Sequence, residues 1–77
     1  MINIVILSHG RDPLRLIIRK NTLVKIVLEM CQKALNLPND IASYVLFLYG
    51  IRCKGPNFDD DLQDNDDLNL VEYEVGC

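Results

Sequence analysis

Apolar and polar positions at the start of the chain form two short runs of β type. Residues 2–8, INIVILS, are rich in β-branched side chains, and residues 14–19, LRLIIR, alternate apolar with basic side chains. Gly10 and Pro13 lie between the two runs, where such residues mark a turn. The pattern predicts a hairpin of two strands.

The next run has a helical period. Its polar positions recur at spacings of 4, 3, 1 and 3 and form one narrow face: Lys25, Glu29, Gln32, Lys33 and Asn36. Asn21 or Thr22 is the predicted N-cap, and Pro38 is predicted to end the helix. Because the other positions are apolar, we expect most of the helix to be buried. The side chains expected in this core are Leu23, Ile26 or Val27, Met30 and Leu70.

The second half of the chain contains three further strand patterns. Residues 44–50, YVLFLYG, form an apolar run that turns at Gly50 into a short fourth strand, residues 51–54. Residues 55–62 are a predicted loop, with one helical turn between Pro56 and Leu62. Residues 68–74, LNLVEYE, alternate and place Leu68 and Leu70 on one face of a fifth strand. The order β-β-α-β-β-β predicts an α+β fold with one helix across one face of a mixed sheet.

Length and composition indicate one domain, residues 1–77, because 77 residues with 49% hydrophobic content suit a single core. The longest apolar runs are far shorter than the roughly 20 residues that cross a bilayer, and the start lacks the features of a signal peptide. Cys31, Cys53 and Cys77 show no CxxC spacing and indicate reduced thiols. We therefore expect a nuclear or cytoplasmic protein without membrane contact.

Charge is distributed unevenly along the chain. Residues 1–39 carry six Lys or Arg against two acids, a net +4, whereas residues 40–77 carry two against nine, a net −7. Such a division predicts two surfaces of opposite sign, each suited to a different partner. The overall charge of −3 argues against nucleic-acid binding by the whole domain. Nothing in the sequence indicates an oligomeric state.

Candidate catalytic and metal-binding residues are few. His9 is the only histidine and lies in a predicted turn, so no nucleophile–base pair is recognisable and we expect no enzymatic activity. Three scattered cysteines with His9 match a zinc site poorly. Six residues follow the spacing of a calcium loop, but Asp66 stands where that loop needs Gly. They are Asp61, Gln63, Asn65, Asp67, Asn69 and Glu72. We expect neither metal nor cofactor.

The order of these segments resembles the ubiquitin-like β-grasp superfamily, and within it the SUMO-like branch. The resemblance covers nearly the whole chain and rests on four segments in order: LVKIVLEMCQKALNLP, VLFLYG, IRCKGPN and DNDDLNLVEY. SUMO and the SUMO-like domains of genome-maintenance proteins share this succession. The segment NDIASY is about two residues longer than is usual there, which leaves the start of the third strand open.

The C-terminal residues depart from the pattern of a conjugated modifier. Ubiquitin and mature SUMO end in Gly-Gly on a tail that an activating enzyme adenylates, whereas this chain ends in VGC with only Gly76. Three residues follow Glu74, too few to reach such an active site. We expect no thioester with an activating enzyme. The resemblance then implies an integral domain, excised from a longer protein.

The acidic stretch before the last strand has two interpretations. Most charge runs are solvated loops, and this is the simpler one. In SUMO-like proteins, however, this stretch docks on a basic surface of the SUMO-conjugating E2. The matching positions are Asp64, Asp66 and Asp67, with Asn65 in place of an acid, while Val45 stands where SUMO carries an arginine in this interface.

Two more surfaces follow from the resemblance. In SUMO, a groove between the second strand and the helix accepts an extended Val/Ile-rich peptide with flanking acids. The positions matching this groove are Arg15, Ile17, Arg19, Lys25, Ile26 and Lys33. The alternative is a charged edge strand that merely resists aggregation. Phe47 and Val71 match the outward apolar patch of ubiquitin, and the alternative for Phe47 is a place in the core.

The sequence therefore predicts a non-covalent protein-interaction module of the SUMO pathway, with the SUMO-conjugating E2 as its first partner. A structural ubiquitin-like subunit of a constitutive multiprotein complex is the alternative, and a conjugated modifier is the third possibility.

Overall fold

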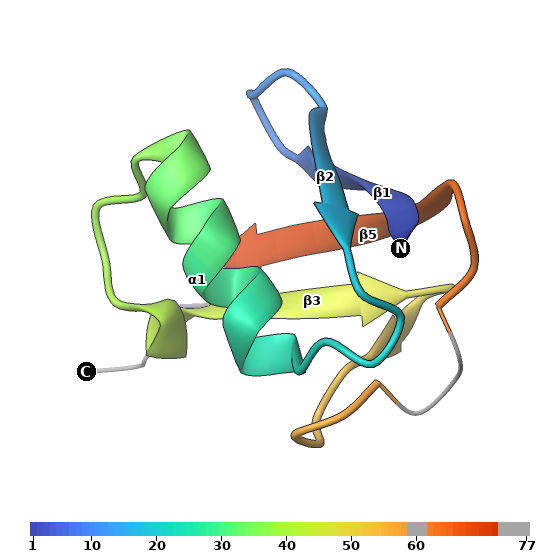
Figure 1. Cartoon of the computed structure of the whole chain (residues 1–77). Coiled ribbons are helices and arrows are strands. Elements are labelled where there is room, and N and C mark those ends of the chain that lie inside the picture. Colours follow the sequence, from blue (N-terminus) through green and yellow to red (C-terminus); the bar gives the residue numbers. More distant parts are fainter. Residues whose placement is uncertain (59–61, 73–77) are drawn as a thin grey trace.

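The computed structural model describes residues 1–58 and 62–72 and has the predicted α+β architecture (Figure 1). Its elements, in chain order, are β1 (Ile2–Ser8), β2 (Leu14–Ile18), α1 (Val24–Leu35), the 3₁₀ helix η1 (Ile41–Ser43), β3 (Tyr44–Leu48), β4 (Ile51–Arg52) and β5 (Asp66–Glu72). The five strands form one sheet in the order β2-β1-β5-β3-β4. The predicted hairpin and all five strands are confirmed.

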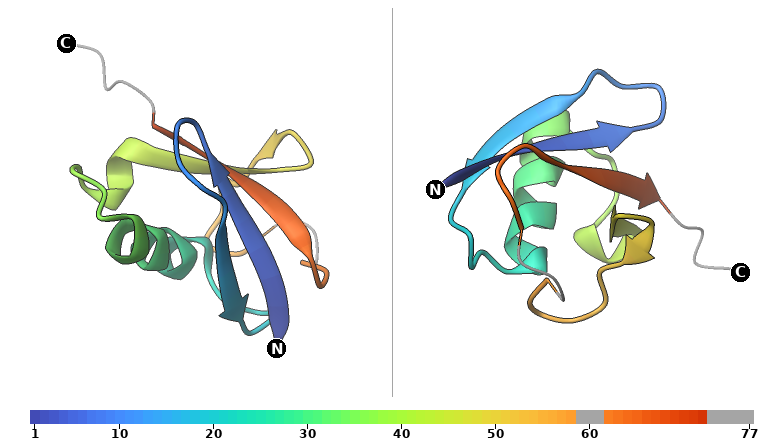
Figure 2. Two further views of the ribbon diagram at one scale, coloured as in Figure 1. Left: turned by 90° about the horizontal axis from the view of Figure 1, so that it is seen from above. Right: turned by 90° about the vertical axis from the view of Figure 1, so that its right-hand side faces the viewer.

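The sheet is mixed because two neighbouring strands, β1 and β5, run parallel. β1 pairs antiparallel with β2 and parallel with β5, and β5 pairs antiparallel with β3. The helix α1 lies across one face of this sheet, as Figures 1 and 2 show from three directions. The opposite face is referred to below as the outer face. None of the described helices is long and apolar enough to cross a membrane.

The core lies between α1 and the inner face of the sheet. Its buried apolar residues are Ile4, Ile6, Ile18, Val24, Val27, Cys31, Leu37, Tyr44, Leu46, Leu48, Leu62, Leu68 and Leu70. The strand residues among them recur at every second position, as expected when one face of a strand is buried. The predicted burial of Leu68 and Leu70 on one face of β5 is confirmed.

The predicted phase of the helix is partly wrong. Val27 is buried as expected, but Leu23 and Ile26 are each 41% exposed and Met30 is half-buried. Val24, Val27 and Cys31 form the buried stripe instead, at spacings of three and four that place them on one side of a helix. The solvent-facing side is therefore wider than the polar stripe of the sequence.

Both ends of α1 are held by backbone groups. No side chain caps the start, so the predicted cap at Asn21 or Thr22 is wrong; the Val24 N–H instead donates to the Pro56 carbonyl at 3.0 Å. At the other end Asn36 adopts a left-handed conformation with φ 51°, a usual way for a helix to end. The helix thus stops two residues before Pro38.

Strand boundaries agree with the sequence prediction at the start of β3 and differ at β4 and β5. The long segment before β3 forms η1, and β3 begins at Tyr44, the first residue of the predicted run; β4 ends at Arg52, two residues earlier than predicted. β5 begins at Asp66, two residues earlier than predicted, because Asp66 and Asp67 continue its pairing with β1. The proposed helical turn between Pro56 and Leu62 lies partly outside the described residues, as do the last two positions of the predicted fifth strand.

A tight turn closes the second hairpin, and the buried side chain of Leu62 holds the acidic stretch in place. Tyr49 and Gly50 both have positive φ, 54° and 78°. A two-residue turn needs positive φ at both positions to match the twist of the hairpin. Leu62 is only 1% exposed and belongs to the core, which its acidic surroundings in sequence do not predict. It anchors the acidic stretch to the domain just before β5.

Candidate protein-interaction surfaces

Asp64, Asp66 and Asp67 lie together where the chain enters β5, and are called the acidic corner below. Asp64 is tied to the start of β1: its Oδ1 accepts hydrogen bonds from the Asn3 backbone N–H at 2.7 Å and from Asn3 Nδ2 at 3.2 Å. The Asn65 N–H also donates to the Asn3 carbonyl at 2.7 Å. These bonds join positions more than 60 residues apart in sequence.

Asp66 closes the same turn from the other side. Its Oδ1 accepts a hydrogen bond from the Tyr49 hydroxyl at 2.6 Å, and its Oδ2 accepts one from the Gln63 backbone N–H at 2.7 Å. Asp67 lies one residue further along β5, where it pairs with Val5 and is exposed on the outer face. The three matching positions are therefore neighbours at the start of β5, with Asp66 and Asp67 on opposite faces of the strand, and the side chains of Asp64 and Asp66 are held by hydrogen bonds.

The pKa of Asp64 is lowered, first by the hydrogen bond from the Asn3 backbone N–H and then by the one from the Asn3 side chain. Both bonds favour the charged carboxylate. An acid with a lowered folded pKa adds stability above its unfolded pKa, and this stability is lost as the pH falls through the folded pKa. The acidic corner should therefore loosen below a pH of about 4.

Replacing Asp64 by Asn should reduce this pH dependence, because the amide keeps the shape but carries no charge. We expect the free energy of unfolding of the original chain to fall more steeply between neutral and acidic pH than that of the variant. Urea titrations across this range measure the difference. Identical pH profiles would mean that Asp64 does not hold the β1–β5 corner.

The predicted peptide groove borders a true sheet edge. β2 is the outermost strand on its side and pairs with β1 alone among the described strands. Arg15 and Ile17 pair with Val5 and Asn3 and so lie on the outer face, not toward α1. Ile17 is 63% exposed, and Arg19 follows directly after the strand.

The helix contributes an apolar flank to this groove. Leu23, Ile26 and Met30, at spacings of three and four, lie on one side of the buried stripe of α1. Lys25 lies on the other side, where it lines a pocket beside β3. The structure thus brings Ile26 near the β2 edge, leaves Lys33 exposed on the solvent side, and separates Lys25 from the predicted groove.

Phe47 and Val71 both belong to the outer face. Val71 is 42% exposed and pairs with Val45, while Phe47 is half-buried and pairs with Asn69. Phe47 is therefore a surface residue and not part of the core. Val45 and Leu7 share this face but were not among the predicted patch residues. Strand alternation alone would have identified them.

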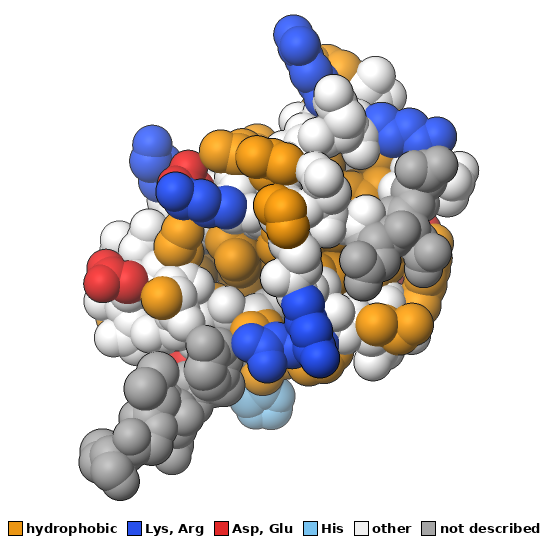
Figure 3. Space-filling model, turned by 90° about the horizontal axis from the view of Figure 1, so that it is seen from below, with side chains coloured by type: hydrophobic (Ala, Val, Ile, Leu, Met, Phe, Trp, Pro, Cys, Tyr) orange, Lys and Arg blue, Asp and Glu red, His pale blue; other side chains and the backbone are white. Residues whose placement is uncertain are grey.

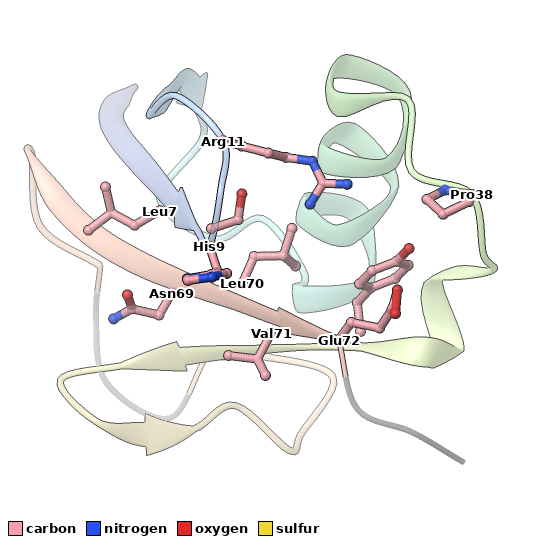
Figure 4. Close-up of a pocket in the computed structure, with 10 residues that line it drawn as sticks. Leu7, His9, Arg11, Pro38, Asn69, Leu70, Val71 and Glu72 are labelled. Carbon is pink, nitrogen blue, oxygen red and sulfur yellow. The ribbon is translucent and has the colours of Figure 1, made fainter. Parts of the chain in front are cut away.

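A pocket of about 740 Å³ opens where β1 and β5 end (Figure 4). Arg11 extends from the turn after β1 toward α1, and Glu72 projects from the end of β5. Ser8 and His9 also line the pocket, but the buried Ser8 Oγ has no hydrogen-bond partner among the described residues. No serine–histidine hydrogen bond of the kind that activates a nucleophile is therefore present in this part of the chain.

The calcium-loop spacing has no structural counterpart in residues 1–58 and 62–72. Asp67 and Asn69 point to the outer face, whereas Glu72 pairs with Tyr44 on the inner side, so these groups do not converge. Asp61 lies outside the described residues. Among the described residues, no group of three or more His, Cys, Asp or Glu is placed to hold a metal ion.

The two described cysteines, Cys31 and Cys53, lie in different surroundings. Cys31 is fully buried, and this burial raises the pKa of its thiol to about 11. It behaves as a small apolar core residue, because the reactive thiolate is suppressed near neutral pH. Cys53 is half-buried beside β4. Cys77 lies outside the described residues.

No protein-family model and no curated protein sequence matches the chain. Among solved structures, ubiquitin of Caldiarchaeum subterraneum superposes with a TM-score of 0.77 at 23% identity, covering 99% of this chain and 98% of that one. The N-terminal ubiquitin-like domain of the 4931431F19Rik protein gives 0.76 at 16% identity, covering 99% and 78%.

ATBAG1, solved in complex with HSP70, gives a TM-score of 0.83 at 14% identity, covering 97% of this chain but 42% of its own. At these identities the likeness concerns the fold. The chain has the ubiquitin-like β-grasp fold, as the sequence resemblance implied.

Proposed function

We propose that the domain is a non-covalent protein-interaction module of the SUMO pathway, and that its acidic corner docks on a basic surface of the SUMO-conjugating E2. The observation that carries this proposal is the fixed geometry of the corner. Asp64 and Asp66 are each held by two hydrogen bonds before any partner arrives. Charges that are already in place lose little conformational freedom on binding.

The choice of partner rests on the sequence resemblance to SUMO-like domains. Complementary charge across such an interface raises the association rate and the specificity more than the affinity. Neither Asp64 nor Asp67 forms an ion pair with Lys or Arg within the described residues, so their charge is available to a partner's cations. Val45, which replaces an arginine of SUMO in this interface, predicts weaker binding than that of SUMO itself.

An NMR titration of the ¹⁵N-labelled domain with the SUMO-conjugating E2 tests the proposal. We expect shifts of the backbone amides of residues 63–68, and smaller shifts at higher salt because exposed charges are screened over about 8–10 Å. The amide of Asp12, in the β1–β2 turn at the far end of β1, should not move. Absence of any shift would overturn E2 docking and favour the structural-subunit alternative.

The β2 edge supports a second mode of binding, the addition of an extended peptide. The supporting observation is an exposed Ile17 on the outer face of β2, an edge strand that pairs with β1 alone among the described strands. Backbone pairing would supply affinity, and apolar contacts with basic residues at the rim would select Val/Ile-rich acidic peptides. In the same titration, a partner using this mode would move the amides of residues 14–19 instead.

Both modes imply a domain that works in the nucleus or cytoplasm, where the SUMO pathway operates. The alternative of a conjugated modifier concerns residues 73–77, which lie outside the described part of the chain. A thioester that forms with the SUMO or ubiquitin activating enzyme and ATP, and that is retained after Cys77→Ser, would mean that the chain is a conjugated modifier and not an interaction module.

A further inference from the structure

A second pocket, of about 700 Å³, lies on the β3 side of α1, on the opposite flank of the helix from the β2 edge, and Val45 of the proposed E2 interface is among its lining residues. Its apolar lining comes from three elements that are distant in sequence: Val24 and Leu28 of α1, Ile41 of η1, and Leu46 of β3. A pocket of this size is within the range of small-ligand sites and large enough to hold a bulky side chain.

Two backbone hydrogen bonds frame this pocket. β4 has only two residues, and the chain makes a last bond to β3 when the Cys53 N–H donates to the Leu46 carbonyl at 2.9 Å. The chain then leaves the sheet and meets α1 where the Val24 N–H donates to the Pro56 carbonyl at 3.0 Å. The pocket lies between these two connections, so it is built into the fold.

The rim of the pocket is positively charged. Lys25 of α1 and Lys54 after β4 both line it and are exposed, and no Asp or Glu is among the described residues that line it. Neither lysine forms an ion pair within the described residues. Figure 3 shows the molecule from below, where apolar side chains are exposed between several separate Lys and Arg side chains. The pocket beside Arg11 and Glu72, in contrast, offers both signs of charge and selects for neither.

We propose that this pocket binds an acidic segment of a partner protein by accepting one of its apolar side chains. The apolar lining would hold the side chain, and Lys25 and Lys54 would pair with carboxylates on either side of it. The proposal rests on the function above only in so far as the domain binds proteins. Because the pocket and the β2 edge lie on opposite flanks of α1, both can be occupied together.

A defined peptide tests this binding. The probe is the acetylated hexapeptide Glu-Asp-Leu-Leu-Asp-Glu, and its control is the same peptide with both leucines replaced by serine. Titrated into the ¹⁵N-labelled domain, the leucine peptide is expected to shift the amides of Lys25, Leu28, Ala42 and Lys54, while the serine peptide is not. No shift up to about 1 mM peptide, or shifts confined to residues 14–19, would overturn the proposal.

Matched variants separate specific pairing from general attraction. Lys25→Glu and Lys33→Glu change the charge equally, are both exposed on α1, and differ in that only Lys25 lines the pocket. We expect Lys25→Glu to raise the Kd of the leucine peptide by about tenfold or more, and Lys33→Glu by less than about twofold. Equal effects would mean that the peptide binds by non-specific electrostatic attraction, and the proposal would be wrong.

Two further outcomes are distinguishable. If sedimentation shows a dimer that Lys54→Glu abolishes, the occupant is a second copy of this chain and the proposal of an acidic partner is wrong. The E2 titration monitors residues 63–68, whereas the peptide titration monitors the flank of α1 that faces away from β2. E2 docking can therefore fail while peptide binding succeeds, and the reverse.

Discussion

Leu68→Ala is expected to lower the free energy of unfolding by about 2–5 kcal/mol, the usual cost of a buried Leu-to-Ala change. Leu68 is fully buried on the central strand β5, with Ile6 of β1 and Leu48 of β3 directly opposite it. Neighbours on both sides are held by strand pairing, so the cavity cannot easily collapse. A domain of this size has a total stability of only about 4–12 kcal/mol, so the loss is a large fraction.

Urea denaturation of three variants tests this interpretation. Asn69→Ala, on the same strand but on the outer face, should change the stability by no more than about 0.5 kcal/mol. Met30→Ala should cost less than Leu68→Ala, because Met30, which the sequence placed in the core, is only half-buried. A larger loss for Asn69 than for Leu68 would mean that the faces of β5 are assigned the wrong way round.

Asp67→Arg is expected to raise the Kd for the SUMO-conjugating E2 by about ten- to a hundredfold, if the acidic corner docks as proposed. A like charge facing the partner's basic surface costs several kcal/mol, and each 1.4 kcal/mol is about tenfold in affinity. Asp67 is part of β5, paired with Val5, so its backbone cannot move to relieve the repulsion. Isothermal titration calorimetry at two salt concentrations measures the change.

The control for this variant is Asp12→Arg. Asp12 is also exposed and changes the net charge equally, but it lies in the β1–β2 turn, at the other end of β1 from the acidic corner. Asp59 to Asp61, which belong to the same acidic stretch, lie outside the described residues. Equal losses of affinity from both variants would indicate general electrostatic steering and not docking.

The strands could be predicted from the sequence, and in β5 the alternation also predicted that Leu68 and Leu70 share the buried face. β3 is apolar at all five positions, so only the structure shows that Tyr44, Leu46 and Leu48 face the core while Val45 and Phe47 face outward. The resemblance to SUMO-like domains then supplied the topology. Pattern alone would not have paired β1 with β5, since these strands lie at opposite ends of the chain.

The helix phase and the acidic corner could not be predicted in full, for two different reasons. In α1 apolar residues occupy both the buried stripe and its flank, so Ile26 and Val27 look alike in sequence. The corner depends on contacts between Asp64 and Asn3, and between Asp66 and Tyr49, which only the folded chain brings together. The burial of Leu62 could not be predicted because charged residues surround it in the sequence.

The parallel pairing of β1 with β5 also determines how the domain responds to force. Since the two strands run in the same direction, Ile2 and Glu72 lie at opposite ends of the pair. A pull on these two residues therefore strains the evenly spaced β1–β5 hydrogen bonds together, in shear, and none can open before the others. A force applied through Ile2 and Glu72 would thus act first on the β1–β5 pair, the part of the sheet that resists it most.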